Sequence, residues 1–185
     1  YFYDANMCGT DVAEKSALSW RGNCHINDEI KGGFHDAGDH VMFGLPQGYS
    51  ASMLGWSYYE FKQAYEKLNQ TAHYKTISEY YCDFFVQCIR NNNGNTEILV
   101  QKGAGNPDHQ YWGSPEAQEN QDSRMDPVTL NAVRGTQPTI SFEDEMFWIS
   151  GSGADIASEY AAALALAYLN FNDGSTKYQN YLNKA

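Results

Sequence analysis

The sequence predicts an all-α fold, and three long helical segments carry that prediction. Residues 49–68 and 72–90 repeat apolar side chains at the spacing of a helix, and residues 154–171 contain a run of alanine and leucine with high helix propensity. Irregular stretches rich in Gly, Asn and Asp separate these segments. We therefore expect a helical protein with long ordered loops.

The N-terminal part of the chain is mostly loop. Residues 1–7 have the character of a helix end, and Cys8-Gly9 closes it because glycine favours helix termination. Residues 8–31 show little periodicity and many polar groups, which predicts an ordered loop. Residues 32–43 follow as a second loop, since a glycine-rich stretch without periodicity favours turns.

Two helices come after this second loop. Pro46 precedes the first, which is predicted over residues 49–68, and a short polar break separates it from the second, predicted over residues 72–90. The apolar positions that define them are Met53, Trp56 and Phe61 in the first and Ile77, Tyr81, Phe84, Phe85, Cys88 and Ile89 in the second.

The rest of the chain alternates between irregular and regular structure. Residues 91–95 predict a turn and residues 96–101 a short strand. Residues 103–150 form a long irregular region, and long ordered loops in compact domains are usually functional. The helix over residues 154–171 follows, and a further helix begins near Thr176.

Charge and composition limit the partners that we expect. The 185 residues carry a formal net charge of -11, which argues against nucleic acid and against an anionic membrane surface. No apolar run is long enough to predict a membrane span. Fourteen Tyr and 4 Trp offer flat faces on which sugar rings can stack, although most of the tyrosines suit core packing. A neutral polymer or small neutral ligand fits this composition.

Residues 32–43 concentrate groups that can do acid–base chemistry. Asp36 and Asp39 stand close enough in sequence to converge on one small target. A hydrophilic turn is the alternative, because Asp-Gly pairs mark turns. The neighbouring side chains are apolar and predict that the loop is anchored in a core: Phe34, Val41, Met42 and Phe43. Carboxylates in a partly buried loop are candidates for acid–base catalysis.

Three motifs resemble glycoside hydrolase family nine, whose members are mainly inverting endo-β-1,4-glucanases. Residues 32–44, Gly-Gly-Phe-His-Asp-Ala-Gly-Asp-His-Val-Met-Phe-Gly, are similar to its N-terminal signature. His109 to Gly113 resembles its His-x-x-Trp-Gly substrate loop, and residues 153–163 resemble a helix start in which Ser158 and Tyr160 depart from the family pattern. The resemblance implies a partial (α/α)6 barrel, a ring of helical hairpins that is truncated here.

The resemblance also implies catalytic roles. Asp39 is the general base and Asp36 its partner at the attacking water, unless Asp36 serves only to cap loop amides. An inverting enzyme places its acid roughly 6.5–9.5 Å from its base. The family's acid is a Glu in a later motif, and no match occurs in this chain. We interpret Glu143-Asp144-Glu145 as a solvated or cation-facing acidic run rather than as that acid.

His109 and Trp112 are the expected substrate-binding residues. By resemblance, Trp112 stacks on a glucose ring and His109 hydrogen-bonds a hydroxyl. Ordinary packing is the alternative for an isolated His and Trp.

A structural zinc is the expected cofactor. Cys8, Cys24, His25 and His35 offer two thiolates and two imidazoles, a complete tetrahedral set, and they resemble a zinc site found in some family members. A Cys8–Cys24 disulfide or two free thiols are the alternatives. Cys82 and Cys88 lie on different helix faces and are expected to take no part. A calcium ion belongs, if anywhere, to the missing part of the domain.

Together these inferences describe residues 1–185 as the N-terminal part of a single catalytic domain, with the remainder missing or in another chain. Both ends fall within helical patterns, which favours this view. The resemblance implies a secreted, extracellular cellulase acting on β-1,4-glucan with inversion. The alternative is a catalytically silent carbohydrate-binding or interaction module of the same fold.

Overall fold

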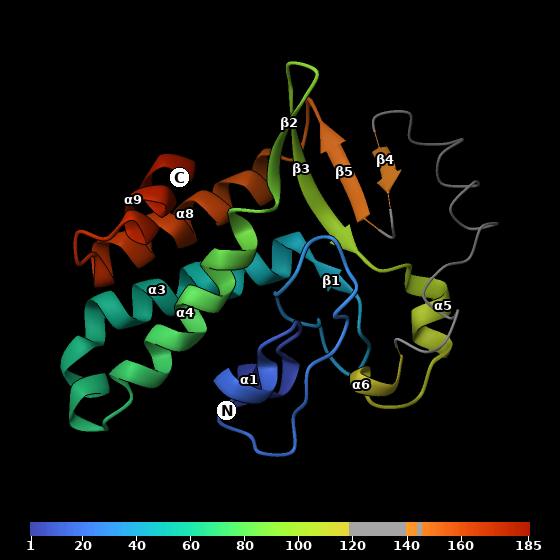
Figure 1. The fold of residues 1–185 in the computed structure, drawn as a ribbon. Coiled ribbons are helices and arrows are strands. Elements are labelled where there is room, and N and C mark those ends of the chain that lie inside the picture. The colour runs from blue at the N-terminus through green and yellow to red at the C-terminus, as the bar shows by residue number, and fades with distance from the viewer. Residues whose placement is uncertain (119–139, 144–145) are drawn as a thin grey trace.

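A computed structural model describes residues 1–118, 140–143 and 146–185 (Figure 1). The helices are α1 (Phe2–Asn6), α2 (Val12–Lys15), α3 (Gly44–Lys67), α4 (Thr71–Phe85), α5 (Gly105–Gln110), α6 (Pro115–Gln118), α8 (Ala154–Phe171) and α9 (Thr176–Lys184). The strands are β1 (Met42–Phe43), β2 (Ile89–Asn92), β3 (Asn95–Lys102), β4 (Ile140–Glu143) and β5 (Met146–Ser150). The long helices form one side of the molecule and the sheet lies beside them (Figure 1). None of the described helices combines the length and apolar character needed to cross a membrane.

The three predicted long helices are confirmed, with shifted ends in two of them. Helix α8 has the predicted bounds. Helix α3 begins at Gly44, so Pro46 lies in its first turn, where a missing N–H breaks no helical hydrogen bond. Helix α4 ends at Phe85 rather than at residue 90, because the chain turns there and enters β2.

Helices α3 and α8 pack unusually closely, and two glycines of α3 make this contact feasible. A Cβ added at Gly48 would lie 2.6 Å from Cβ of Glu159, and one at Gly55 would lie 2.8 Å from Cβ of Leu166. Real Cβ atoms do not approach each other so closely. Any larger residue at these positions would therefore push the two helices apart.

The all-α prediction is wrong in one respect, because the chain also builds a five-stranded antiparallel sheet. Strand β3 pairs with β1, β2 and β5, and β4 pairs with β5. The predicted turn and the predicted strand at 96–101 are confirmed as parts of the β2–β3 hairpin. Asn93 and Gly94 at its tip have φ of 51° and 87°, the left-handed conformations that a tight hairpin turn requires.

Three regions predicted to be irregular contain short elements. Helix α2 lies within residues 8–31, β1 forms the end of residues 32–43, and α5, α6, β4 and β5 lie within residues 103–150. Such short elements carry too few residues for a periodic pattern, so their stability comes from tertiary packing.

Residues 32–43, the acidic loop, are anchored in the core, as their apolar side chains predict. Phe34, Val41 and Met42 are each no more than 1% exposed. The ring of Phe34 stacks on Tyr81 of α4 with centroids 3.9 Å apart. Burial of these side chains fixes both ends of the segment that carries Asp36 and Asp39.

Candidate functional site

Backbone hydrogen bonds hold the acidic loop at several points. The His35 N–H donates to Asn6 O (2.8 Å) and the Asp36 N–H donates to Val41 O (2.9 Å). The Phe34 N–H donates to Oε1 of Gln47, a buried side chain in the first turns of α3 (2.9 Å). The loop is therefore an ordered turn that presents residues 36–39 outward.

The negative charge of Asp39 acts on the neighbouring Asp36. Asp39 Oδ1 accepts a hydrogen bond from the Ala37 N–H (3.3 Å), which folds this side chain back over the loop. Partial burial, and then the negative charge of Asp39, raise the pKa of Asp36 above 3.8, while His109 acts in the opposite direction. The charge of Asp39 therefore acts on the carboxyl group of Asp36.

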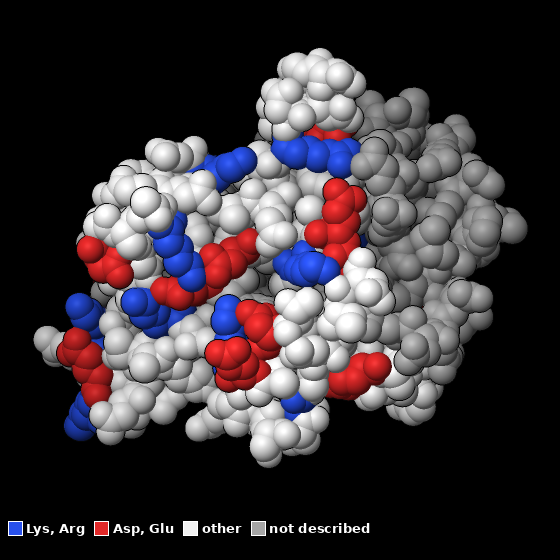
Figure 2. All heavy atoms as spheres, viewed as in Figure 1, with Lys and Arg blue, Asp and Glu red and all other residues white. Residues whose placement is uncertain are grey.

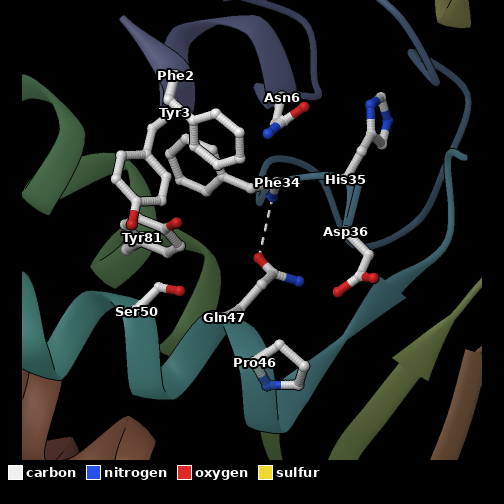
Figure 3. Close-up of a pocket in the computed structure, with 10 residues that line it drawn as sticks. All are labelled: Phe2, Tyr3, Asn6, Phe34, His35, Asp36, Pro46, Gln47, Ser50 and Tyr81. Atoms are coloured by element: carbon white, nitrogen blue, oxygen red, sulfur yellow. Dashed lines mark hydrogen bonds between the residues drawn. The ribbon is translucent and has the colours of Figure 1, made fainter. Parts of the chain in front are cut away.

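A small cavity of about 50 Å³ lies beside Asp36. Aromatic rings of α1, α4 and the loop line it together with Gln47 (Figure 3). His35 and Asp36 leave the backbone in different directions in this view, and the Asp36 carboxylate is on the side of Gln47 and Pro46. To hold one water molecule, a cavity needs about 10–15 Å³ of space that a water-sized sphere can occupy, so this cavity has room for water next to the carboxylate.

The structure brings His109 to the acidic loop. Its Nε2 lies 2.5 Å from Oδ2 of Asp39, although 70 residues separate the two in sequence. Helix α5 carries His109, and the turn after it carries Trp112, whose side chain is 97% exposed. Of the two expected substrate-binding residues, one contacts the predicted base and the other stands free for a ligand.

The four residues expected to bind zinc form a cluster at the start of the acidic loop. The ligand atoms of Cys8, Cys24, His25 and His35 all lie within 4.8 Å of one another, and all four side chains are buried. Sγ of Cys8 is 3.3 Å from Nδ1 of His25. All four cysteines of the chain are free, so the Cys8–Cys24 disulfide is not formed in the structure. The residues that the sequence singled out as zinc ligands thus meet at one point.

The chemistry of this cluster fits a zinc ion. Burial, and then the imidazoles of His25 and His40, lower the pKa of His35 well below 6.5, so its ring is neutral. Its Nε2 is buried without a hydrogen-bond partner in the described part of the chain. Burial raises the pKa of the Cys8 thiol, which means that a thiolate there needs a cation beside it. A tetrahedral set of two sulfurs and two nitrogens is the donor set that zinc prefers.

The backbone at His25 is also unusual. Its φ of 51° places a non-glycine residue in the left-handed region. The Gly9–Cys24 bridge, with N···O distances of 3.1 Å in both directions, precedes it directly. Strain of this kind costs of order 1–3 kcal/mol and is found where the structure must aim a side chain.

Sequence reasoning missed three buried residues behind the acidic loop. His40, Asp108 and Gln118 are 6%, 1% and 0% exposed. His40 lies in the loop, and Asp108 adjoins His109, yet neither was given a role; Gln118 stands in a region without any periodic signal. Their hydrogen bonds join residues 68 and 78 apart, which local sequence patterns do not reveal.

The acidic run at Glu143, Asp144 and Glu145 gives no further information about a catalytic acid. Asp144 and Glu145 lie outside the described residues, and for Glu143 only the backbone, in β4, is described.

Comparison with known proteins places this helical fold and its acidic loop among the glycoside hydrolases. The chain belongs to Glycosyl hydrolase family 9, whose family model matches residues 1–185. Endoglucanase A of Bacillus pumilus is 31% identical over 183 residues, which cover 96% of this chain and 24% of that protein. The endoglucanase of Dictyostelium discoideum is 32% identical over 190 residues, covering 96% and 23%.

Solved structures are similar over the whole chain. The cellulase Cel9M of C. cellulolyticum is 38% identical with a TM-score of 0.78, covering 99% of this chain and 40% of that one. Endoglucanase CelQ from Clostridium thermocellum, in complex with cellotetraose, is 32% identical with a TM-score of 0.74, covering 100% and 25%. The chain thus spans about a quarter of the curated relatives named above.

Proposed function

We propose that this chain supplies the general base of an enzyme that hydrolyses β-1,4-glucosidic bonds of cellulose or related glucans with inversion. The observation that carries the proposal is the acidic loop, which is ordered by backbone hydrogen bonds and presents Asp36 and Asp39 together, with Nε2 of His109 2.5 Å from Oδ2 of Asp39. Relatives named endoglucanase and a neighbour structure in complex with cellotetraose support the substrate class. Secretion of the enzyme to the extracellular space, where such polymers occur, is part of the proposal.

In this mechanism Asp39 accepts a proton from water. The water oxygen attacks the anomeric carbon from the face opposite the leaving group, the glycosidic C–O bond breaks, and an acid protonates the departing oxygen. Asp36 shares the task of orienting the water, and His109 fixes the orientation of the Asp39 carboxylate through the 2.5 Å contact. We assign the acid to the remainder of the domain, because this chain offers no matching motif.

The remainder of the domain is the first partner that we propose. Helix α3 exposes large apolar side chains along one stripe, including Leu45, Tyr49, Met53, Trp56 and Tyr59, each between 42% and 55% exposed. Their spacing of three or four residues puts them on one side of the helix. In a closed (α/α)6 barrel, further helices of the same domain would cover this stripe. The hairpins α3–α4 and α8–α9 would then be two of the six.

Zinc is the cofactor that we propose for the cluster of Cys8, Cys24, His25 and His35. When bound, it would supply structural cross-linking rather than acid–base chemistry. His35 directly precedes Asp36, so holding this imidazole holds the stem of the acidic loop.

The test compares Asp39→Asn with Asp173→Asn in the full-length protein that contains this chain. Loss of a general base costs about 10²–10⁴-fold in turnover of a soluble β-1,4-glucan. Asp173 lies in the turn after α8, away from the loop, and asparagine there keeps an oxygen for the Ser175 N–H, so this control retains activity. Near-normal turnover by Asp39→Asn would refute the assignment. A wild-type protein that binds cello-oligosaccharides in calorimetry without hydrolysing them would instead be the silent binding module.

A further inference from the structure

The buried residues His40, Asp108 and Gln118 form a closed ring of hydrogen bonds next to Asp39 and His109. The His40 N–H donates to Oδ1 of Asp108 (2.8 Å), the Gln118 amide nitrogen donates to Oδ2 of Asp108 (2.9 Å), and His40 Nδ1 donates to Oε1 of Gln118 (2.8 Å). His40 thus takes part with its backbone and with its side chain. Buried networks in which every member is satisfied hold a single geometry.

The ring also reaches the cysteine–histidine cluster. Oε1 of Gln118 accepts a second hydrogen bond, from Nε2 of His25 (3.0 Å). An oxygen that faces two imidazole nitrogens requires both of them to carry a proton. His25 is then protonated at Nε2, which leaves its Nδ1 lone pair facing Sγ of Cys8 at 3.3 Å. Gln118 therefore selects the tautomer of His25 that offers Nδ1 as a ligand.

Two residues of the ring are sequence neighbours of Asp39 and His109, which contact each other. Asp39 precedes His40, and Asp108 precedes His109. Two neighbouring contacts consequently join the loop to α5: Asp39 to His109 at 2.5 Å and His40 N to Asp108 at 2.8 Å. A shift of Asp108 relative to His40 must also change the contact between Asp39 and His109.

We propose that Asp108 and Gln118 are positioning residues that hold Asp39 and His109 in their working geometry and couple them to the metal-ligand cluster. This inference rests on the proposed glucan hydrolysis for its kinetic consequence, and its metal consequence is independent of it. Neither residue touches the reacting atoms. Their contribution is the alignment of the base, where a displacement of about 1 Å can cost about 10²-fold in rate.

The alternative is that the two residues only dock α5 and α6 onto the rest of the fold. Glu116 provides the matched control, because it also anchors α6, through hydrogen bonds to Nε of Arg21 (3.1 Å) and the Gly22 N–H (2.9 Å), without touching the ring. If docking alone mattered, Glu116→Gln would lower both the melting temperature and kcat as much as a ring variant does.

An exchange of donor and acceptor tests the ring. In Asp108→Asn, an NH2 group replaces the oxygen that accepts the hydrogen bond from the Gln118 amide. In Gln118→Glu, a carboxylate oxygen replaces the donor and faces the carboxylate of Asp108. In the full-length protein we expect each to lower kcat on a soluble β-1,4-glucan by about 10²-fold with KM nearly unchanged. The double variant D108N/Q118E restores one donor opposite one acceptor at the same net charge, and we expect it to recover most of kcat. Glu116→Gln should keep kcat.

A metal measurement provides the readout that does not depend on hydrolysis. Loss of a hydrogen bond to a ligating histidine typically costs about 10–100-fold in metal affinity. We expect Gln118→Met, which fills similar space without hydrogen bonds, to release zinc to a chromophoric chelator by that factor more readily than wild type. If Asp108→Asn or Gln118→Glu does not fold, the zinc measurement on Gln118→Met still tests the role of Gln118.

The kinetic and zinc measurements together distinguish a failure of the proposed glucan hydrolysis from a failure of the positioning role of Asp108 and Gln118. A wild-type protein without glucan hydrolysis but with weakened zinc in Gln118→Met would refute the proposed function and keep the coupling of ring and cluster. An active wild type whose single variants retain kcat and zinc affinity would overturn the inference. So would single variants whose lost kcat the double variant does not recover.

Discussion

Nε2 of His109 in helix α5 lies 2.5 Å from Oδ2 of Asp39 in the acidic loop, so an imidazole on a helix contacts a carboxylate on a loop. The sequence predicts that His109 binds a sugar hydroxyl, and the structure also places it in contact with the proposed base. The His109 side chain is 54% exposed and that of Asp39 is 17% exposed, so solvent reaches both partners of this contact.

His109→Ala should lower kcat/KM on soluble β-1,4-glucan by about 10²-fold, since the base loses the group that orients it. His109→Gln, whose amide can donate the same hydrogen bond, should retain a larger share of activity. His73→Ala is the control, because it breaks an imidazole–carboxylate contact of 2.8 Å with Asp4 outside the acidic loop. Equal activity of wild type and His109→Ala would contradict the positioning of Asp39 by His109.

The pKa of Asp36 should lie above 3.8 and respond to its neighbours with opposite signs. Partial burial raises this pKa, the charge of Asp39 raises it further, and His109 lowers it. Asp39→Asn should therefore lower the pKa of Asp36, and His109→Ala should raise it. Carboxyl carbon shifts in an NMR titration measure each value. A pKa that does not move in Asp39→Asn would mean that the two carboxylates are uncoupled.

The raised pKa of Asp36 also determines how the stability of the protein changes with pH. The folded protein holds the Asp36 proton more tightly than the unfolded chain does. The stabilising contribution of this group is therefore complete below pH 3.8 and is lost as the pH rises through the raised pKa. Asp36→Asn should remove this part of the pH dependence in denaturant titrations. A profile identical to that of wild type would contradict the shift.

Cysteine substitutions should separate zinc ligands from packing residues. Cys8→Ser should lose the zinc that elemental analysis finds in protein purified without added metal, since a serine hydroxyl is a poor ligand for zinc. Cys82→Ser should keep it, although Cys82 is equally buried, because its thiol hydrogen-bonds Ala163 O in the contact between α4 and α8. A wild-type protein that contains no zinc would refute the metal site.

Trp112→Ala should weaken substrate binding more than chemistry. The side chain is 97% exposed, so little packing is lost on truncation. Loss of a stacking contact of about 0.5–1.5 kcal/mol corresponds to a rise in KM of up to about tenfold, with kcat nearly unchanged. Trp20→Ala is the control, at a site 68% exposed in the N-terminal loop. If both variants bind cello-oligosaccharides like wild type, Trp112 is not part of the binding site.

Gly55→Ala should destabilise the fold by about 1–3 kcal/mol, because its Cβ would lie 2.8 Å from Cβ of Leu166. Gly38→Ala is the control for stability. No atom lies within 4 Å of a Cβ at Gly38, and its φ is not positive. Chemical denaturation of both variants measures the difference. An unchanged midpoint for Gly55→Ala would show that α3 and α8 can separate without cost.

The sequence predicted those parts of the fold in which a local pattern repeats often enough. Helix α8 has its predicted bounds because alanine and leucine favour a helix at every position of its centre. Strand β5 was not predicted, because Met146–Ser150 is a short apolar run and one of its two partners, β3, is far away in sequence. The sheet therefore appeared only with tertiary contacts.

The candidate site divides in the same way. Asp36, Asp39 and the four cluster residues stand out by chemical type, and resemblance to a family signature strengthened each assignment. Gln118 has no such mark, since an exposed glutamine and a buried one look alike in sequence. Its role depends on bonds to His40 and His25 across 78 and 93 residues, and these exist only in the folded chain.

The anchoring of the acidic loop has a consequence for synthesis on the ribosome. Its backbone is bonded by Asn6, Gln47 and Asp108, and Asp108 in turn by Gln118. A nascent chain that has emerged only as far as helix α3 already contains both aspartates but lacks the partners of His40. The end of the loop at His40 is thus ordered late in vectorial folding, and hydrogen exchange at the His40 amide should become slow only after residue 118 has left the exit tunnel.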